Sequence, residues 1–213
     1  TRALFPRLGM FSQDVTEGKG KTLRVVNEAG IFYVDYQTED EDENGKKLWE
    51  KTEIGTEIEG IILYQRKQLR FYDSTNETYT SSPVYDTDDE VIPLFCNKQE
   101  VARGTSAELK ARPEFQGVSA KGKAISKLEE NRVLYVLYKD EVFQMSLRGT
   151  SMYAFLKYSK TVLPPSVVTL FGSEEKEKGT IAWNQMTFAV SKKLNGEEVA
   201  DVQRRNNEIR ESV

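Results

Sequence analysis

The sequence predicts a mainly β fold, and three observations support this prediction. Apolar residues fall in short runs rich in Tyr, Phe, Val and Ile, residue types that favour strands, at 31–36, 56–73 and 131–149. Clusters of Gly, Asn, Asp and Ser separate these runs, as expected of turns. Helical signals are confined to short segments after residue 104 and to the C-terminal tail.

In the first half, two predicted strands flank an acidic turn. The run at 31–36 precedes five consecutive acids at 39–43, whose mutual repulsion favours a solvated hairpin tip, and residues 46–55 then return toward the sheet. The strand at 56–73 follows. The later elements are expected in this order: a helix capped by Thr105 or Ser106 and ended by Pro113, a hairpin at 131–149, a helix at 150–162 capped by Thr150 or Ser151, a strand at 167–171, a charged loop at 172–179 and a strand at 180–190.

Two helical segments have apolar residues at helical spacing. In the segment 150–162 these residues are Met152, Phe155 and Leu156, which form its expected inner face. In the tail, at about 196–213, five residues alternately three and four apart form a seam with one Asn: Val199, Val202, Asn206, Ile209 and Val213. The seam fits either docking of the helix on its own domain or pairing with a second copy, which would give a homo-oligomer.

The order of elements suggests an architecture. From residue 131 it runs strand, strand, short helix, strand, loop and strand, with further strands before it. A small Greek-key barrel with a helix between its third and fourth strands is the OB fold, whose ligand groove crosses strands two and three. We therefore expect residues 1–213 to form a single OB-like domain with an elaborated N-terminal half and a C-terminal helix.

The residue types present restrict the chemistry. The chain has no His and one Cys, Cys96, which removes imidazole bases, Ser-His-Asp triads, internal disulfides and N/S zinc sites. Asp86, Asp88, Asp89 and Glu90 could hold magnesium, but a surface turn before the next apolar run is the simpler interpretation. We expect no enzymatic activity, no metal and no cofactor.

Charge and hydropathy indicate which partners and which cellular location to expect. The net charge is −4, yet residues 101–160 carry 11 Lys and Arg against 6 Asp and Glu. A basic zone within an acidic chain can attract polyanions. No apolar run approaches the roughly 20 residues of a membrane-spanning helix, and the first residues lack a signal-peptide pattern, so we expect a cytoplasmic protein without membrane contact.

The strand at 61–72 carries the clearest functional pattern. Tyr64, Arg66, Arg70 and Tyr72 alternate along one predicted face, on which residues two apart are separated by about 7 Å. Aromatic rings stack on bases while Arg and Lys contact phosphates, so this face is expected to bind single-stranded nucleic acid. Ordinary cross-strand pairing on a solvated sheet face is the competing interpretation. Further residues of these types extend the predicted interface: Tyr79, Lys121, Lys123, Lys139, Arg148, Tyr153, Lys157 and Trp183.

Three segments together resemble a known family: "IEGIILYQRKQLRFYD…TYTSSPVYD", "RVLYVLYKDEVFQMSLRGTSMYAFLKY" and "VTLFGSEEKEKGTIAWNQMTFAV". Over about residues 56–190 their element order is similar to that of OB-fold single-stranded DNA-binding proteins of the type carried by phages and related mobile elements. The resemblance implies sequence-nonspecific binding in DNA replication or recombination. Such proteins commonly recruit replication enzymes through an acidic C-terminal tail, whereas this sequence ends in EIRESV.

Other functions stay open at this point. The net acidity and the seam in the tail suit a structural or interaction subunit, such as a virion component, without nucleic-acid affinity. The residue pattern also does not separate DNA from RNA, because contacts to 2′-hydroxyl groups leave no sequence signature.

Overall fold

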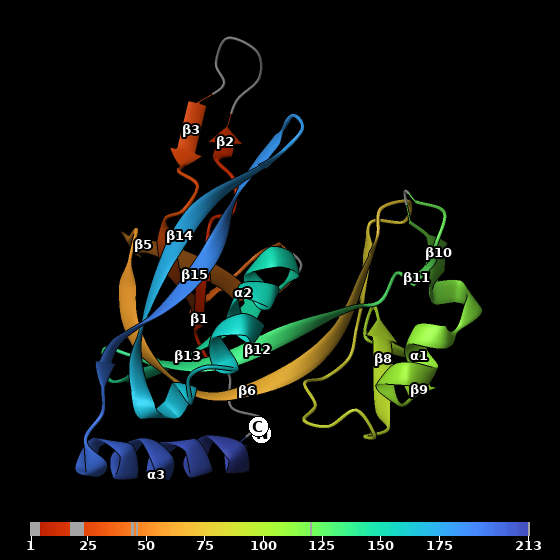
Figure 1. The fold of residues 1–213 in the computed structure, drawn as a ribbon. Coiled ribbons are helices and arrows are strands. Elements are labelled where there is room, and N and C mark those ends of the chain that lie inside the picture. Colours follow the sequence, from red (N-terminus) through yellow and green to blue (C-terminus); the bar gives the residue numbers. More distant parts are fainter. Residues whose placement is uncertain (1–4, 18–23, 44, 46, 120, 213) are drawn as a thin grey trace. The chain divides into compact units, whose positions relative to one another are not determined.

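A computed structural model describes residues 5–17, 24–43, 45, 47–119 and 121–212, and the fold is mainly β, as predicted (Figure 1). Contacts group the chain into two compact units. Unit 1 comprises Thr1–Tyr64 and Leu134–Val213, and unit 2 comprises Gln65–Val133. The chain passes between the units within two long strands, β6 (Ile58–Asp73) and β12 (Glu129–Tyr138). No change of composition marks either crossing, which is why the sequence was expected to form a single domain.

Unit 1 contains most of the β structure. Besides its parts of β6 and β12, its elements are β1 (Arg7–Met10), β2 (Val15–Glu17), β3 (Arg24–Asn27), β4 (Phe32–Glu41), β5 (Lys47–Gly55), β13 (Glu141–Leu147), α2 (Gly149–Ser159), the 3-10 helix η3 (Pro164–Ser166), β14 (Val167–Lys178), β15 (Ile181–Lys193) and α3 (Gly196–Ser212). The strands are ordered β5-β4-β1-β13-β12-β6, β14 pairs with both β6 and β15, and β2 and β3 form a separate pair.

The core of unit 1 lies on one face of this sheet. It includes Phe32, Leu134, Met145, Phe155 and Phe171, all 0% exposed. Gly60 allows β6 to approach β12, because a Cβ atom there would lie 2.9 Å from Val136 Cγ1. Among the described residues no ladder joins β15 to β1 or β13, so strand pairing does not close the sheet into a barrel.

The predicted hairpin at 131–149 is confirmed as β12 and β13. Lys139 and Asp140 form its two-residue turn with positive φ angles of 48° and 62°, the conformation of a type I′ turn. The helix α2 is also confirmed, and its predicted inner residues Met152, Phe155 and Leu156 pack on the core.

The predicted cap of α2 is wrong. Its N-cap is Arg148, without a side-chain hydrogen bond. Ser151 Oγ instead accepts a hydrogen bond from the Met186 backbone N–H at 3.0 Å, and Thr150 Oγ1 accepts one from Trp183 Nε1 at 3.1 Å. Both hydroxyl groups therefore attach the helix to β15, against which it lies (Figure 1).

The charged loop expected at 172–179 is wrong as well. β14 continues to Lys178 and pairs with β15 along its whole length, leaving a turn at Gly179 and Thr180. Charged residues such as Glu174 and Lys176, which form an ion pair at 2.6 Å, occupy a two-stranded ribbon whose faces are largely exposed. Burial does not impose an apolar alternation there, so the sequence lacks the pattern that predicts a strand.

The C-terminal helix α3 docks within unit 1. Val202, Asn206 and Ile209 of the predicted seam are 4%, 6% and 4% exposed, and α3 contacts η3. Docking on its own chain, one of the two interpretations of the seam, therefore accounts for these positions. Val213 lies outside the described residues. A homo-oligomer through another surface of α3 stays a prediction.

Unit 2 is built on the second part of β6 and the first part of β12. Its other elements are β7 (Thr78–Ser81), β8 (Ile92–Cys96), β9 (Gln99–Gly104), α1 (Ser106–Ala111), the 3-10 helix η2 (Pro113–Phe115), β10 (Gln116–Val118) and β11 (Ala124–Ser126). The sheet is ordered β6-β7-β8-β9, and β10 pairs with β11. Leu69, Tyr85, Leu94 and Leu109 form the centre of its core, each 0% exposed.

The predicted start of α1 is confirmed. Thr105 is its N-cap, and Thr105 with Glu108 forms a capping box in which each side chain bonds the other residue's backbone N–H. Pro113 ends the helix by starting η2. In the described part of the chain, no helix combines the length and the apolar character needed to cross a membrane.

Candidate nucleic-acid interface

The residues predicted to form one exposed row on β6 have different surroundings. Ile62 and Leu63 are 2% and 1% exposed, so both faces of β6 are covered at the start of the row. Of the four predicted residues, only Tyr72 is exposed, while Arg70 is half-buried with its guanidinium beside the exposed ring of Tyr79. The prediction that Tyr64, Arg66, Arg70 and Tyr72 share one water-facing surface is therefore wrong for its first two members.

Tyr64 lies in unit 1 and is covered there by other side chains. Its ring stacks on Tyr135, with centroids 6.3 Å apart and an interplanar angle of 24°, and the Arg210 guanidinium lies 4.5 Å from its centre. Tyr135 is 1% exposed and meets Phe5 edge-on at 5.3 Å. In this structure Tyr64 ties α3 to the sheet and does not present a free ring face.

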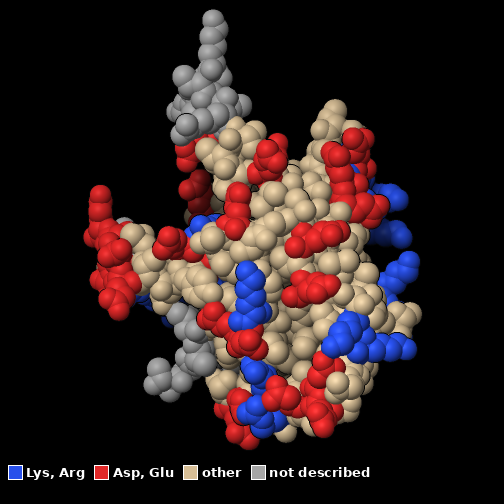
Figure 2. All heavy atoms as spheres, turned by 90° about the vertical axis from the view of Figure 1, so that its left-hand side faces the viewer, with Lys and Arg blue, Asp and Glu red and all other residues tan. Residues whose placement is uncertain are grey.

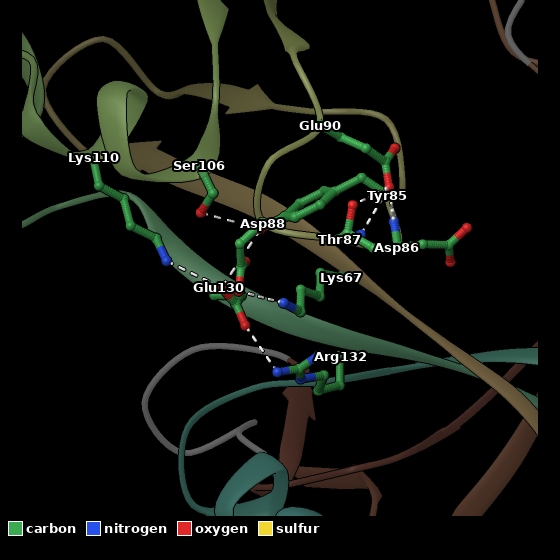
Figure 3. Close-up of polar contacts among 10 residues, drawn as sticks. All are labelled: Lys67, Tyr85, Asp86, Thr87, Asp88, Glu90, Ser106, Lys110, Glu130 and Arg132. Atoms are coloured by element: carbon green, nitrogen blue, oxygen red, sulfur yellow. Dashed lines mark hydrogen bonds and ion pairs between the residues drawn. The ribbon is translucent and has the colours of Figure 1, made fainter.

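Arg66 and its neighbour Lys67 are neutralised by the acidic segment that follows β7. Arg66 Nε pairs with Asp86 Oδ1 at 3.1 Å. Lys67 Nζ pairs with Asp88 Oδ2 at 2.7 Å (Figure 3). The side chains of Arg66 and Lys67 are only 11% and 15% exposed. The hydrogen bond from Lys67 is the main reason why the pKa of Asp88 is lowered. The basic stretch and the acidic cluster of the sequence are thus partners of each other.

A second cluster of polar side chains in unit 2 lies beside the segment that contains Asp86 and Asp88 (Figure 3). The Glu130 carboxylate forms ion pairs with Lys110 and Arg132, each at 3.1 Å. The Tyr85 hydroxyl lies 3.3 Å from Ser106 Oγ, and burial raises its pKa to about 12. Glu90 Oε1 accepts the backbone N–H groups of Asp86 and Thr87. Among the described residues no group of three or more Asp, Glu or Cys side chains is arranged to hold a metal ion.

The open cluster on β6 and β7 consists of Arg70, Tyr72 and Tyr79. Tyr72 and Tyr79 face each other across the strand pair, with ring centroids 4.6 Å apart, and are 47% and 54% exposed. The Arg70 guanidinium lies 5.2 Å from the centre of the Tyr79 ring, in the diagonal position of the ladder. Arg70 has no ion pair within the described ranges. Two rings and an unneutralised cation therefore meet at the surface.

The other face of the same strands explains why this cluster stays open. Leu69 is buried in the core of unit 2, and Phe71 meets Phe115 edge-on at 6.1 Å. Because successive side chains of a strand alternate between faces, Arg70 and Tyr72 must point outward. Asp73 fixes the following turn by accepting hydrogen bonds from Asn76 Nδ2 and the Thr75 backbone, and these bonds lower its pKa.

A second group of predicted residues meets on α2 in unit 1. Thr150, Tyr153 and Lys157 are three and four residues apart and so share one side of the helix. Trp183 donates its Nε1–H to Thr150, which places the indole at the start of this side. Tyr153 is 67% exposed and Lys157 is exposed. This flank again combines rings with a cation.

The remaining four predicted residues are exposed. Lys121 and Lys123 lie between β10 and β11 in unit 2. Lys139 lies in the β12–β13 turn with its Nζ atom 5.2 Å from the Tyr138 ring centre. Arg148 caps α2. Among the described residues, no ion pair or ring contact joins Lys121 or Lys123 to Arg70 within unit 2, or Lys139 or Arg148 to Tyr153 within unit 1.

A third set of rings and cations, not predicted from the sequence, lies on β1, β4 and β5. The Arg7 guanidinium lies 3.7 Å from the centre of the Trp49 ring, and Lys51 Nζ lies 5.0 Å from that of Tyr33. The signal was present, since Trp49-x-Lys51 has the same spacing as Arg70-x-Tyr72. Acids surround these residues in the sequence, so no basic stretch marks the set.

Acidic side chains limit where a polyanion could bind. Figure 2 shows one face of the molecule, on which Asp and Glu are spread widely and Lys and Arg form only small groups. Many charges elsewhere are paired locally, as in α3, where Arg204 contacts Glu208 at 3.0 Å and Arg205 contacts Asp201 at 3.0 Å. A binding surface must therefore be sought where cations are unpaired and rings are exposed.

Comparison with known proteins identifies no relative: no protein-family model, no curated protein and no solved structure matches the chain.

Proposed function

We propose that this protein binds single-stranded DNA with little sequence preference, stacking bases on Tyr and Trp rings and contacting phosphates through Arg and Lys, and that it acts in DNA replication or recombination. The observation that carries the proposal is the open cluster of Arg70, Tyr72 and Tyr79. Two half-exposed rings held 4.6 Å apart by a strand pair, beside an unpaired guanidinium, offer both contacts that an unpaired strand makes.

The flank of α2 adds a second place where the same chemistry is available. Tyr153, Lys157 and Trp183 provide two rings and a cation within unit 1. Neither group contains paired donors and acceptors aimed at base edges, so binding is expected to depend on backbone charge and stacking and to tolerate most sequences.

An OB-like arrangement of unit 1 is part of this proposal. The elements β6, β12, β13, α2, β14 and β15 follow one another in the OB order of three strands, a helix and two strands. The first strand of an OB fold pairs with both the second and the fourth, and β6 pairs with β12 and β14. Unit 2 would then be an insertion between the first two strands.

The experiment is equilibrium binding of fluorescein-labelled oligo(dT) to the full chain, followed by anisotropy at two salt concentrations, with duplex DNA of equal length as competitor. We expect binding that weakens steeply as salt rises, because phosphate contacts release counterions. The duplex should compete poorly, because its bases are not free to stack. An oligo(rU) arm shows whether RNA binds equally well.

Absence of oligo(dT) binding at low salt would refute the proposal. A stoichiometric complex with another protein, without oligonucleotide affinity, would then favour the alternative of a structural or interaction subunit.

A further inference from the structure

The outer face of β1, β4 and β5 brings together five residues with complementary chemistry. The strand register places Arg7 opposite Asp35, and Asp35 opposite Lys51. Residues opposite one another share a face, as do residues two apart on a strand. Tyr33 and Trp49 therefore belong to the same face as Arg7, Asp35 and Lys51. All five lie in unit 1.

The two cations of this face are held on aromatic rings. Arg7 lies 3.7 Å from the centre of Trp49 and keeps 56% of its side chain exposed. Lys51 Nζ lies 5.0 Å from the centre of Tyr33, whose ring packs on Phe11 with centroids 4.6 Å apart. Both cations are therefore held beside ring faces, where a strand that stacks on the rings would bring its phosphates.

Gly9 explains how Tyr33 lies across the neighbouring strand. A Cβ atom at Gly9 would be only 2.5 Å from the Tyr33 hydroxyl oxygen. The absence of a side chain on β1 at this position lets the phenol ring cover the strand backbone. The ring is thereby fixed in place beside Lys51.

Asp35 supplies an unused hydrogen-bond acceptor between the cations. The residue is 3% exposed, and its Oδ2 atom lies 3.9 Å from Arg7 Nη1. Its Oδ1 atom has no hydrogen-bond partner among the described residues. A buried carboxylate oxygen without a donor is costly, and it would be satisfied by a ligand that brings an N–H group. The Arg7 side chain, which is the exposed member of the pair, would have to move aside.

A nucleotide of an unpaired strand has the groups that this face lacks. Its base presents a flat ring and amino or imino N–H groups, and its phosphate is an anion. Carboxylates accept hydrogen bonds from the N4 amino group of cytosine. We propose that the outer face of β1, β4 and β5 is a second nucleotide-binding site, with Trp49 and Tyr33 as stacking surfaces, Arg7 and Lys51 as phosphate contacts and Asp35 as acceptor for the base. The inference rests on the proposed function, and it assigns a separate surface to it.

The two tryptophans of the chain provide the test, because Trp49 belongs to this face and Trp183 does not. In the Trp183→Phe variant, Trp49 is the sole indole and reports on the face by its fluorescence. The anisotropy of fluorescein-labelled oligo(dC), titrated with the same Trp183→Phe variant, reports independently on binding by any part of the protein. We expect unlabelled oligo(dC) to change Trp49 emission with the same midpoint as the anisotropy titration.

Matched variants separate this face from the rest of the molecule. Trp49→Ala is expected to weaken oligo(dC) binding about fivefold or more, the lower limit for losing one stacked base. Arg7→Gln and Lys51→Gln, which spare the ring packing, should each flatten the salt dependence. Leu48→Ala is the control, because Leu48 is adjacent on β5, 45% exposed and on the opposite face; it should bind as the wild type does.

Three outcomes decide the matter. A saturable Trp49 signal together with weaker binding by the Gln variants supports the second site. The second site is overturned, and the proposed function is left intact, if the protein binds oligo(dC) by anisotropy while Trp49 emission stays unchanged. In that case Trp49→Ala, Arg7→Gln and Lys51→Gln would also keep the wild-type affinity. No oligonucleotide binding by anisotropy at low salt overturns both.

Discussion

Two adjacent stretches of β6 contain the same kinds of residue and have opposite surroundings. At 66–67, Arg66 and Lys67 are mostly covered and paired with Asp86 and Asp88. At 70–72, Arg70 is half-buried but has no ion pair among the described residues, and it lies beside the exposed rings of Tyr72 and Tyr79. The stretches are only three residues apart, yet just one of them is available to a ligand.

The difference comes from the neighbouring strand segment. Beside 67, the chain returns through Tyr85, whose backbone exchanges hydrogen bonds with Lys67 at 2.8 and 2.9 Å and thereby brings Asp86 and Asp88 within reach. Beside 70–73, the neighbour is β7, which contributes Tyr79 and no acid. A basic stretch in a sequence is therefore a binding surface only where its spatial neighbours leave it unneutralised.

The largest expected effect is on stability, and it tests whether Leu69 and Tyr72 lie on opposite faces of β6. Leu69→Ala should lower the free energy of unfolding by about 2–5 kcal/mol, because it leaves a cavity in the core of unit 2. Tyr72→Ala, on the outward face, should change it by about 0.5 kcal/mol or less. Urea denaturation of both variants checks this, and similar losses would show that Tyr72 is part of the core.

The next effect concerns affinity. Tyr72→Ala and Tyr79→Ala should each weaken oligo(dT) binding by about 5- to 150-fold, the range for losing a stacked base. Because the two rings contact each other, the double variant should lose less than the product of the single losses. Anisotropy titration measures all three, with circular dichroism as the folding control. Wild-type affinity in both single variants would remove the cluster from the interface.

A smaller effect should follow from releasing the paired stretch. Asp86→Asn and Asp88→Asn together should make Arg66 and Lys67 available and steepen the dependence of log K on log salt by about 1–2. Asp89→Asn is the matched control, since it removes one acid from the same loop without breaking a described ion pair. An equal change in the control would mean that general charge, rather than pairing, is responsible.

The smallest expected effect is a pH dependence of stability. The Lys67 hydrogen bond lowers the pKa of Asp88 below its ordinary value of 3.8, so the pair stabilises the fold above that pH and the contribution is lost as the pH falls through the lowered pKa. Because Asp88 is 68% exposed, the contribution is about a few tenths of a kcal/mol. Thermal unfolding at pH 7 and pH 3 should show a smaller pH difference for Asp88→Asn than for the wild type.

Local signals in the sequence predicted local structure well. The capping box of Thr105 and Glu108 and the hairpin around Lys139 and Asp140 depend on residues within a few positions of one another, and both are confirmed. The inner face of α2 follows in the same way from its helical spacing. The long ribbon at 172–178 was missed because its charged, exposed residues have no apolar alternation to reveal a strand.

The candidate site was harder to predict from the sequence, because the exposure and charge pairing of its residues depend on partners that are distant in the sequence. Arg66 meets Asp86 twenty positions away, Tyr64 meets Arg210 from the last helix, and Arg7 meets Trp49 across two strands. None of these pairs leaves a local pattern. Tyr72 and Tyr79 were both predicted site residues by residue type, but their direct cross-strand contact depends on the register of β6 and β7, which the sequence does not reveal.

The most direct test is the slope of log K against log salt for oligo(dT) binding by Arg70→Ala and Arg66→Ala, two identical changes four residues apart on β6. The open-cluster account predicts that Arg70→Ala lowers the slope by about 1, the loss of one phosphate contact, while Arg66→Ala keeps the wild-type slope. An unchanged slope for Arg70→Ala, or a lower one for Arg66→Ala alone, would contradict it.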